Sequence, residues 1–200
     1  MPACAHVVPT HSTQSDLQRN KLNKDCFLRQ NFDKKTAIVY FCAIAVAWLA
    51  IDRVTKLVAE TNVLGQVFRN NVFGLFEFKL AHNTGAAWSI FSNSTLALGV
   101  FSLVVCALLL AYLFVYKKGS ANLLELCGSA LVFAGGIGNA IDRFALGYVV
   151  DFINTTFMSF PVFNVADIGV TCGVVLFLAG TFISLAESEN TESEDNPNDA

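Results

Sequence analysis

The sequence predicts an all-α membrane protein: a bundle of four transmembrane helices with a small outer-surface β-sheet between the first and second helices. Hydrophobic residues make up 54% of the 200 residues and charged residues only 14%, whereas about 25% of the residues in an average soluble domain are charged. Four apolar runs follow one another along the chain, each long enough to form most or all of a membrane span. Composition and spacing therefore favour an integral membrane protein over a soluble globular one.

The charged residues divide the chain into three segments. Six of the thirteen Lys and Arg residues lie in residues 1–35, and six of the sixteen Asp and Glu residues lie in residues 187–200. We interpret residues 1–35 as a basic cytoplasmic arm and residues 187–200 as an acidic, disordered cytoplasmic tail. Residues 36–186 between them form the predicted membrane domain.

The first apolar run, from Thr36 to Ile51, is short for a transmembrane helix. At 1.5 Å per residue it spans about 24 Å, less than the roughly 30 Å of bilayer hydrocarbon. We therefore expect the helix to continue past Asp52, so that Asp52 and Lys56 share a face at the outer edge of the membrane and can pair. A cleaved signal peptide is disfavoured because residues 50–53 offer no small-x-small cleavage site.

The long connection of residues 60–93 carries the predicted sheet. From Leu75 to Leu80 apolar and polar residues alternate, which is typical of a strand with one buried face. Residues 85–91 supply either a second strand or a segment at the water–lipid boundary, where Trp88 is favoured. We expect this sheet to lie on the outer surface of the membrane.

Three further apolar runs complete the bundle. They extend from Ser94 to Tyr116, from about Ala121 to Ile141, and from about Val165 to Ala186. The third helix is rich in glycine near its end, and small residues there allow another helix to approach closely. Glu125 falls in the first turn of the same helix, near its positive end.

The distribution of basic residues predicts the topology. Four spans place both ends of the chain on one side of the membrane, together with the basic Lys117–Lys118 turn. Residues 144–161, on the other side, contain no Lys or Arg. Because short cytoplasmic segments carry an excess of Lys and Arg, we expect both termini to be cytoplasmic and the two longer connections to lie outside.

Asp151 and Asp167 are the strongest candidates for chemistry. Asp151 stands in an apolar stretch, and Asp167 falls in the first turn of the fourth helix, which Asn164 can cap. Carboxylates near hydrocarbon are costly and are seldom kept without a use. Pro161 and other turn formers allow the chain to fold back, so the two carboxylates can face each other. An ionised carboxylate could then draw a proton from water while a protonated one donates to a carbonyl oxygen.

The end of the third helix adds three polar side chains, Asn139, Asp142 and Arg143, that project from roughly one face. The ordinary interpretation is a helix end at which Asp142 pairs with Arg143. On these residues alone a protease, a proton-coupled transporter and a purely structural carboxylate pair all stay open. The transporter is disfavoured because the sequence has no inverted repeat and its charges cluster near the helix ends.

Other kinds of site have weaker support. His82 is the only histidine outside the basic arm, and the sequence offers no partner for it. The cysteines and histidines have no metal-ligand spacing, and there is no phosphate-binding loop. The basic arm lacks interleaved aromatic residues, so we expect no nucleic-acid partner and a role in topology and in contacts with anionic lipid headgroups.

Four blocks of the sequence together resemble the lipoprotein signal peptidases (signal peptidase II) of bacteria. In chain order they are Asp52 to Lys56, Asn83 to Ile90, Gly138 to Phe152, and Phe163 to Asp167. The resemblance covers about residues 37–186, with the blocks in the family's order on a four-helix layout. The arm before residue 36 is longer than the family core requires, and the acidic tail is additional.

The resemblance implies an intramembrane aspartyl endopeptidase that removes signal peptides from diacylglyceryl-modified prolipoproteins, cleaving just before the lipidated cysteine. It implies that Asp151 and Asp167 are the catalytic pair. The positions it implies for substrate binding or support are Asn139, Arg143, Asn164, Asp142, Asn83, Gly85, Asp52 and Lys56. It implies no metal or organic cofactor.

The resemblance also implies a location and partners. We expect a multi-pass protein of the bacterial cytoplasmic (inner) membrane, with its active site toward the outer face. The expected partners are lipid-modified prolipoproteins and membrane lipids, and we expect the protein to act as a monomer. The outer sheet resembles the surface cradle with which the family helps to hold its substrate.

Overall fold

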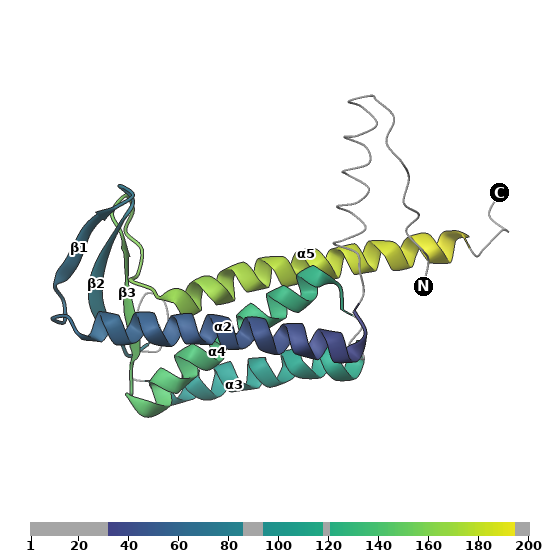
Figure 1. Cartoon of the computed structure of the whole chain (residues 1–200), viewed down its shortest axis with the longest axis horizontal. Helices are drawn as coiled ribbons and strands as arrows, with labels where there is room; N and C mark the ends of the chain where they lie inside the picture. The colour runs from purple at the N-terminus through teal and green to yellow at the C-terminus, as the bar shows by residue number, and fades with distance from the viewer. Residues whose placement is uncertain (1–31, 86–93, 118–120, 195–200) are drawn as a thin grey trace, which may run out of the picture.

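The computed structural model describes residues 32–85, 94–117 and 121–194. Four long helices run side by side, and a three-stranded antiparallel sheet stands across one end of them (Figure 1). The elements are α2 (Lys34–Glu60), β1 (Val67–Val72), β2 (Phe76–Asn83), α3 (Thr95–Ala111), η2 (Tyr112–Tyr116), α4 (Leu123–Ala145), β3 (Val149–Thr155) and α5 (Val165–Glu194). The predicted fold class, a four-helix membrane bundle with a small sheet, is confirmed.

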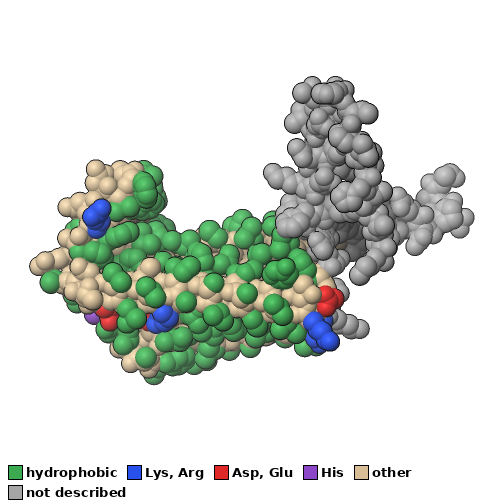
Figure 2. Space-filling model, viewed as in Figure 1, with side chains coloured by type: hydrophobic (Ala, Val, Ile, Leu, Met, Phe, Trp, Pro, Cys, Tyr) green, Lys and Arg blue, Asp and Glu red, His purple; other side chains and the backbone are tan. Residues whose placement is uncertain are grey.

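All four helices have the length and the apolarity needed to cross a membrane. The spans are residues 34–60, 95–115, 123–145 and 165–186. In the third span 56% of the residues are buried, against 17–22% in the others, so α4 is the central helix. The other three present apolar side chains outwards, which gives the bundle the hydrophobic surface visible in Figure 2 and suits it to lipid.

Glycines allow α4 and α5 to pack closely, as the sequence predicted for the glycine-rich helix. A Cβ atom added to Gly173 of α5 would lie 2.7 Å from the carbonyl oxygen of Gly128 in α4. Added to Gly138, it would lie 2.7 Å from Oδ2 of Asp52 in α2. No side chain fits at such distances, so both glycines bring polar groups of neighbouring helices together.

The first helix follows the sequence prediction closely. Asp33 caps α2 by accepting hydrogen bonds from the N–H groups of Lys35 and Thr36. The helix continues past Asp52 to Glu60, so it is long enough to span the hydrocarbon. Its last turns also carry charged side chains to the end of the bundle where the sheet lies.

The sheet contains the predicted strand and two strands, β1 and β3, that the sequence did not reveal. β2 includes the alternating residues from Phe76 to Leu80, and Leu75 lies in the turn before it. β1 precedes that turn, and β3 comes from the connection between α4 and α5. The first four residues of β3, from Val149 to Phe152, are all buried. A strand that is buried on both faces is mostly apolar, so apolar and polar residues do not alternate along it. Of the predicted second strand, residues 86–91 lie outside the described residues.

The fourth helix is longer than expected. The sequence predicted an acidic, disordered tail from residue 187, but α5 continues to Glu194. No Gly or Pro occurs among residues 187–194, so this part of α5 contains no residue that strongly opposes a helix. The basic arm up to residue 31 lies outside the described residues.

Candidate active site

The candidate site lies where the sheet meets the bundle. Asp151 of β3 is only 2% exposed, and Asp167 lies in the first turn of α5. Both line one pocket of about 520 Å³. The other residues around the pocket are Asn83, Asn139, Arg143, Val149, Phe160, Pro161, Val162, Phe163, Ile168, Thr171 and Cys172. The pocket thus combines two carboxylates with a mostly apolar wall.

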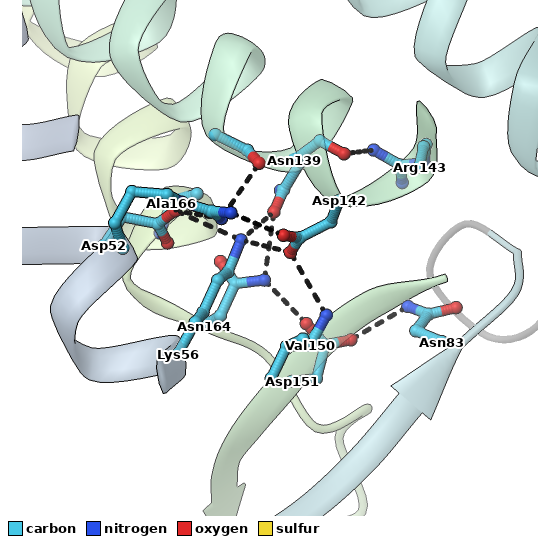
Figure 3. A network of polar contacts seen from close by, with 12 residues as sticks. Asp52, Lys56, Asn83, Asn139, Asp142, Arg143, Val150, Asp151, Asn164 and Ala166 are labelled. Carbon is cyan, nitrogen blue, oxygen red and sulfur yellow. Dashed lines mark hydrogen bonds and ion pairs between the residues drawn. The ribbon is translucent and has the colours of Figure 1, made fainter. Parts of the chain in front are cut away.

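Asp151 accepts one hydrogen bond on each carboxylate oxygen. Asn83 Nδ2 donates to its Oδ2 at 3.0 Å, and Asn164 Nδ2 donates to its Oδ1 at 2.7 Å (Figure 3). The antiparallel register of β2 and β3 pairs Asn83 with Val149 and brings it beside Asp151. The N–H of Gly85 donates to Asn83 Oδ1 at 2.9 Å and so turns the amide nitrogen toward the carboxylate.

Asp167 is held by the start of its own helix and by α4. Its backbone N–H donates to Asn164 Oδ1 at 3.0 Å, while its Oδ2 accepts the N–H of Asn164 at 3.1 Å. Asn164 therefore caps α5, as predicted. Oδ1 of Asp167 accepts a hydrogen bond from Asn139 Nδ2 at 2.8 Å.

Two asparagine amides join the carboxylates. The same Nδ2 of Asn164 that donates to Asp151 lies 3.1 Å from Oδ1 of Asn139, whose own Nδ2 donates to Asp167. Asp151 and Asp167 are 16 positions apart in the sequence, yet one chain of hydrogen bonds connects them.

The pocket changes the acidity of Asp151. Burial disfavours its charged form, and the negative charge of Asp167 acts in the same direction. Together they raise the pKa of Asp151 from 3.8 to about 7, against the opposing hydrogen bonds from Asn83 and Asn164. A carboxyl group that titrates near neutral pH can hold or release a proton under working conditions.

Arg143 and Asp142 do not pair, contrary to the ordinary interpretation of the sequence. Successive helical residues point about 100° apart, so Asp142 faces α2 while Arg143 faces the pocket. The charge of Arg143 acts on both Asp151 and Asp167. Its Nη1 donates to the carbonyl of Asn139 at 3.5 Å, and its buried Nε has no hydrogen-bond partner in the described part of the chain.

Below the pocket, four charges from α2 and α4 form a neutral network. Lys56 Nζ lies 3.2 Å from Asp52 Oδ2, the pairing that the sequence predicted, and 2.8 Å from Asp142 Oδ2. Arg53 binds the same two acids, at 2.8 Å to Asp52 and 2.7 Å to Asp142. Two carboxylates and two cations therefore balance in a nearly buried cluster.

Three members of this network also position parts of the site. Lys56 Nζ donates to Asn139 Oδ1 at 2.8 Å. Asp142 Oδ2 accepts the N–H of Val150 at 3.2 Å, and Asp52 Oδ1 accepts the N–H of Ala166 at 3.0 Å (Figure 3). Val150 and Ala166 each precede one of the two pocket carboxylates in the chain, so the network fixes the backbone that carries them.

Arg53 and the partners of His82 are not among the residues that the sequence predicted for the site. Two buried acids with a single lysine require a second cation, and this charge balance could have identified Arg53. His82 Nε2 lies 3.3 Å from Glu60, and its ring stacks on Tyr148 at 3.8 Å. No local spacing could reveal these partners, since they come from α2 and from the turn before β3.

No group of three or more His, Cys, Asp or Glu side chains within residues 32–85, 94–117 and 121–194 is arranged to hold a metal ion. The carboxylates of the site are instead surrounded by amide, ammonium and guanidinium donors.

Known proteins similar to this chain share most of its length. The family model described as signal peptidase (SPase) II matches residues 44–183. A lipoprotein signal peptidase of Microcystis aeruginosa is 38% identical over 145 residues, which cover 72% of this chain and 92% of that protein. One from Enterococcus faecalis is 36% identical over 160 residues, covering 78% of this chain and 93% of that protein.

Solved structures resemble the fold as well. A structure described as a bacterial membrane enzyme superimposes with a TM-score of 0.64 at 31% identity, covering 86% of this chain and 98% of that one. A second structure with the same description gives a TM-score of 0.62 at 33% identity, covering 76% and 95%.

Proposed function

The chain belongs to the signal peptidase II family, a family of membrane peptidases that remove signal peptides from prolipoproteins, and we propose that it acts as an aspartic endopeptidase in which Asp151 and Asp167 are the catalytic pair. The observation that carries the proposal is the pocket that these two carboxylates share. Aspartic proteases use two neighbouring carboxyl groups that hold one proton between them.

In the proposed reaction the pair acts on one water molecule. The ionised carboxylate takes a proton from water as the water oxygen attacks the scissile carbonyl carbon, and the protonated carboxyl donates to the carbonyl oxygen. The tetrahedral intermediate then collapses: one of its hydroxyl groups returns a proton to the ionised member of the pair, the C–N bond breaks, and the amine leaves with the proton that the other member took from water. We assign the initial proton to Asp151, because its pKa of about 7 keeps it partly protonated at neutral pH.

The pocket also has groups suited to holding a peptide. The buried Nε of Arg143, without a partner among the described residues, can donate to a substrate carbonyl. Asn139 and Asn164 keep the carboxylates in place. The apolar wall from Phe160 to Phe163 suits an apolar peptide and the acyl chains of a diacylglyceryl group. We propose cleavage just before the cysteine that carries this group.

The chain is a multi-pass membrane protein, and the position of the site fits an outer-face active centre. The pocket and sheet lie at one end of the bundle, whereas Lys34 and Lys117 lie at the ends of helices that meet at the opposite end (Figure 1). Because basic residues are kept on the cytoplasmic side, we propose that both termini are cytoplasmic and that the pocket faces outward.

Replacing either carboxyl group tests the proposal. Asp151→Asn and Asp167→Asn keep the side-chain shape but remove the group that exchanges protons, so each should lower kcat on a diacylglyceryl-modified precursor by about 10³-fold or more. Glu77→Gln is a matched control, since Glu77 is a carboxylate of the same sheet that binds Asn154 and lies outside the pocket. Cleavage at wild-type rates by either asparagine variant would remove the assignment.

A further inference from the structure

A cluster of three side chains outside the pocket joins three separate segments of the chain. Glu60 ends α2, His82 lies in β2, and Tyr148 directly precedes β3. His82 Nε2 lies 3.3 Å from Glu60 Oε1, and the hydroxyl of Tyr148 donates to the same oxygen at 3.2 Å. The rings of His82 and Tyr148 stack with centroids 3.8 Å apart and an interplanar angle of 16°. We call these three residues the clasp.

The clasp lies on the sheet directly behind the contact between Asn83 and Asp151. The antiparallel register pairs His82 with Val150, and successive residues of a strand point to opposite faces. His82 and Tyr148 therefore share one face of the sheet, and the residues that follow this pattern on the other face are Asn83 and Asp151. On each face the contact runs diagonally from β2 to β3, a distance that aromatic and other long side chains can bridge.

The ends of β2 and β3 need a fastening of their own. The register of the two strands is interrupted between Phe78 and Ala81, so the last pairs, up to Asn83, are separated from the rest of the ladder. β2 ends at Asn83. A short segment with few main-chain hydrogen bonds opens more readily than the interior of a sheet. Side chains that connect these ends therefore limit how far the strands can separate.

One face of α2 reaches toward both carboxylates of the pocket. Lys56 and Glu60 are four residues apart and so lie on the same face of the helix. Lys56 donates to Asn139, which in turn donates to Asp167. Glu60, one turn later, holds the strand ends that lie beside Asp151. The last two turns of α2 thus set the distance between the helix and each of the two carboxylates.

We propose that the clasp positions Asp151 for the reaction by holding the ends of β2 and β3 at the separation at which Asn83 reaches the carboxylate. Glu60, His82 and Tyr148 do not line the pocket, so they are positioning residues rather than catalytic ones. Without the clasp the strand ends separate, and the hydrogen bond from Asn83 Nδ2 to Asp151 weakens. The effect on turnover rests on the proposed peptidase function, whereas the effect on Asp151 does not.

The exposure of the clasp separates this role from a general contribution to stability. The side chains of His82 and Glu60 are 28% and 32% exposed. Contacts as exposed as these contribute little to the stability of a whole protein. Their loss should therefore change the local position of the strand ends more than it changes folding, which thermal unfolding in detergent can verify for each variant.

The titration of Asp151 tests the clasp without any activity. Infrared difference spectra between Tyr148→Ala and the same variant carrying Asp151→Asn isolate the carboxyl band. The hydrogen bond from Asn83 lowers the pKa of Asp151, so a weaker bond should move the midpoint upward by roughly half a pH unit. An unchanged midpoint would overturn the proposal.

Asn154→Ala is the matched control for this titration. Asn154 Nδ2 donates to Glu77 across the same two strands, beyond the interruption of the register. Its replacement removes a contact between the strands but leaves their ends clasped, so the midpoint of Asp151 should stay at the wild-type value. A shift as large as that of Tyr148→Ala would show that any loosening of the sheet acts on Asp151, which would also overturn the proposal.

Glu60→Ala is a second variant that changes the clasp from the side of the helix. Alanine is a good helix former and Glu60 is the last residue of α2, so folding should be retained. The loss of a negative charge would by itself lower the pKa of Asp151. An upward shift of the midpoint therefore reports a change of position and not of charge, and a downward shift would contradict the proposal.

A double variant tests whether the clasp acts through Asn83. In the Asn83→Ala background the hydrogen bond to Asp151 is already absent, so Tyr148→Ala should move the midpoint no further. If Tyr148→Ala shifts the midpoint as much in this background as in the wild type, the clasp does not work through Asn83 and the proposal is wrong.

Kinetics test the consequence for the reaction. On a diacylglyceryl-modified precursor, Tyr148→Ala should lower kcat roughly fivefold and change KM less than about twofold, because the clasp acts on Asp151 and not on substrate binding. A raised KM with an unchanged kcat would contradict positioning of the carboxylate. Because the titration needs no activity, failure of the clasp and failure of the peptidase proposal give different results.

Discussion

At the scale of single residues, the site depends on asparagine amide groups whose orientation is fixed by their hydrogen bonds. Asn139 Oδ1 accepts hydrogen bonds from Lys56 and Asn164, so its Nδ2 must face Asp167. A rotated amide would place its NH₂ group against the Lys56 ammonium and its oxygen against a carboxylate. Each buried hydrogen bond contributes about 1 kcal/mol to the stability of the folded protein, and a buried polar group left without a partner destabilises it by more than that. The amides therefore hold the two carboxylates at fixed positions before any substrate arrives.

Arg53 should matter for stability although it lies outside the pocket. Arg53→Gln leaves Asp52 and Asp142, which are buried, with Lys56 as their single cation, so one negative charge is unbalanced. Because the Arg53 side chain is 29% exposed, we expect a loss of only about 1–2 kcal/mol. Thermal unfolding in detergent measures it.

Arg69→Gln is the control for this loss, since Arg69 is exposed on β1 and its removal should change stability by less than about 0.5 kcal/mol. An equally small effect of Arg53→Gln would show that the four-charge network does not need its second cation.

At the scale of elements, the contact between α4 and α5 sets the position of Asp167. Gly128 and Gly173 let the two backbones touch, and Trp48 of α2 donates from Nε1 to the carbonyl of Val165 at 3.2 Å. The start of α5 is therefore held from two sides. A side chain inserted between α4 and α5 would move the helix that carries one of the two carboxylates.

Gly128→Val tests this dependence. Its Cβ would overlap the backbone of α5 near Phe177 and Gly173, which cannot give way as a flexible side chain could. We expect a loss of roughly 2–4 kcal/mol and a fall in activity beyond the loss of folded protein. Ala97→Val is the control, because Ala97 of α3 is exposed on the lipid-facing surface. Similar behaviour of the two variants would contradict a tight α4–α5 contact.

The elements also show which features the sequence could predict. The four helices were predictable because length and apolarity are local properties. The strand β2 was predictable because apolar and polar residues alternate along part of it. β3 was not, because a strand that is buried on both faces has no period that distinguishes it from a short apolar run. Asp151 and Asp167 stood out as acids in apolar stretches, but Arg53 and the Glu60–His82–Tyr148 contacts depend on packing between distant segments.

At the scale of the whole molecule, polar groups gather at both ends of an apolar bundle. Opposite the pocket, Glu125 is fully buried, lies 2.8 Å from Lys117 Nζ, and completes the cap of α4 with Asn122. Asn122 also donates to the carbonyl of Gly180 in α5 at 2.8 Å. One polar cluster thus fastens the helices at each end, while the surface between the clusters suits hydrocarbon.

The proposed orientation of this bundle can be checked with fusions. Green fluorescent protein attached after Ala200 should fluoresce, since it folds in the cytoplasm, and alkaline phosphatase inserted at Gly65 should be active, because it requires export. A bundle inserted the other way would give a dark C-terminal fusion and an inactive phosphatase. Fractionation of both fusions to the membrane serves as the control for insertion.

The central claim is that Asp151 and Asp167 share one pocket, and the titration of Asp151 tests it most directly. Infrared difference spectra between the wild type and Asp151→Asn isolate its carboxyl band across pH. We expect this band to titrate at about pH 7, because burial and the charge of Asp167 both raise the pKa of Asp151. In the Asp167→Asn background the negative charge is gone, so the midpoint should move to lower pH. A midpoint near the ordinary value of 3.8, unchanged by Asp167→Asn, would contradict a shared pocket.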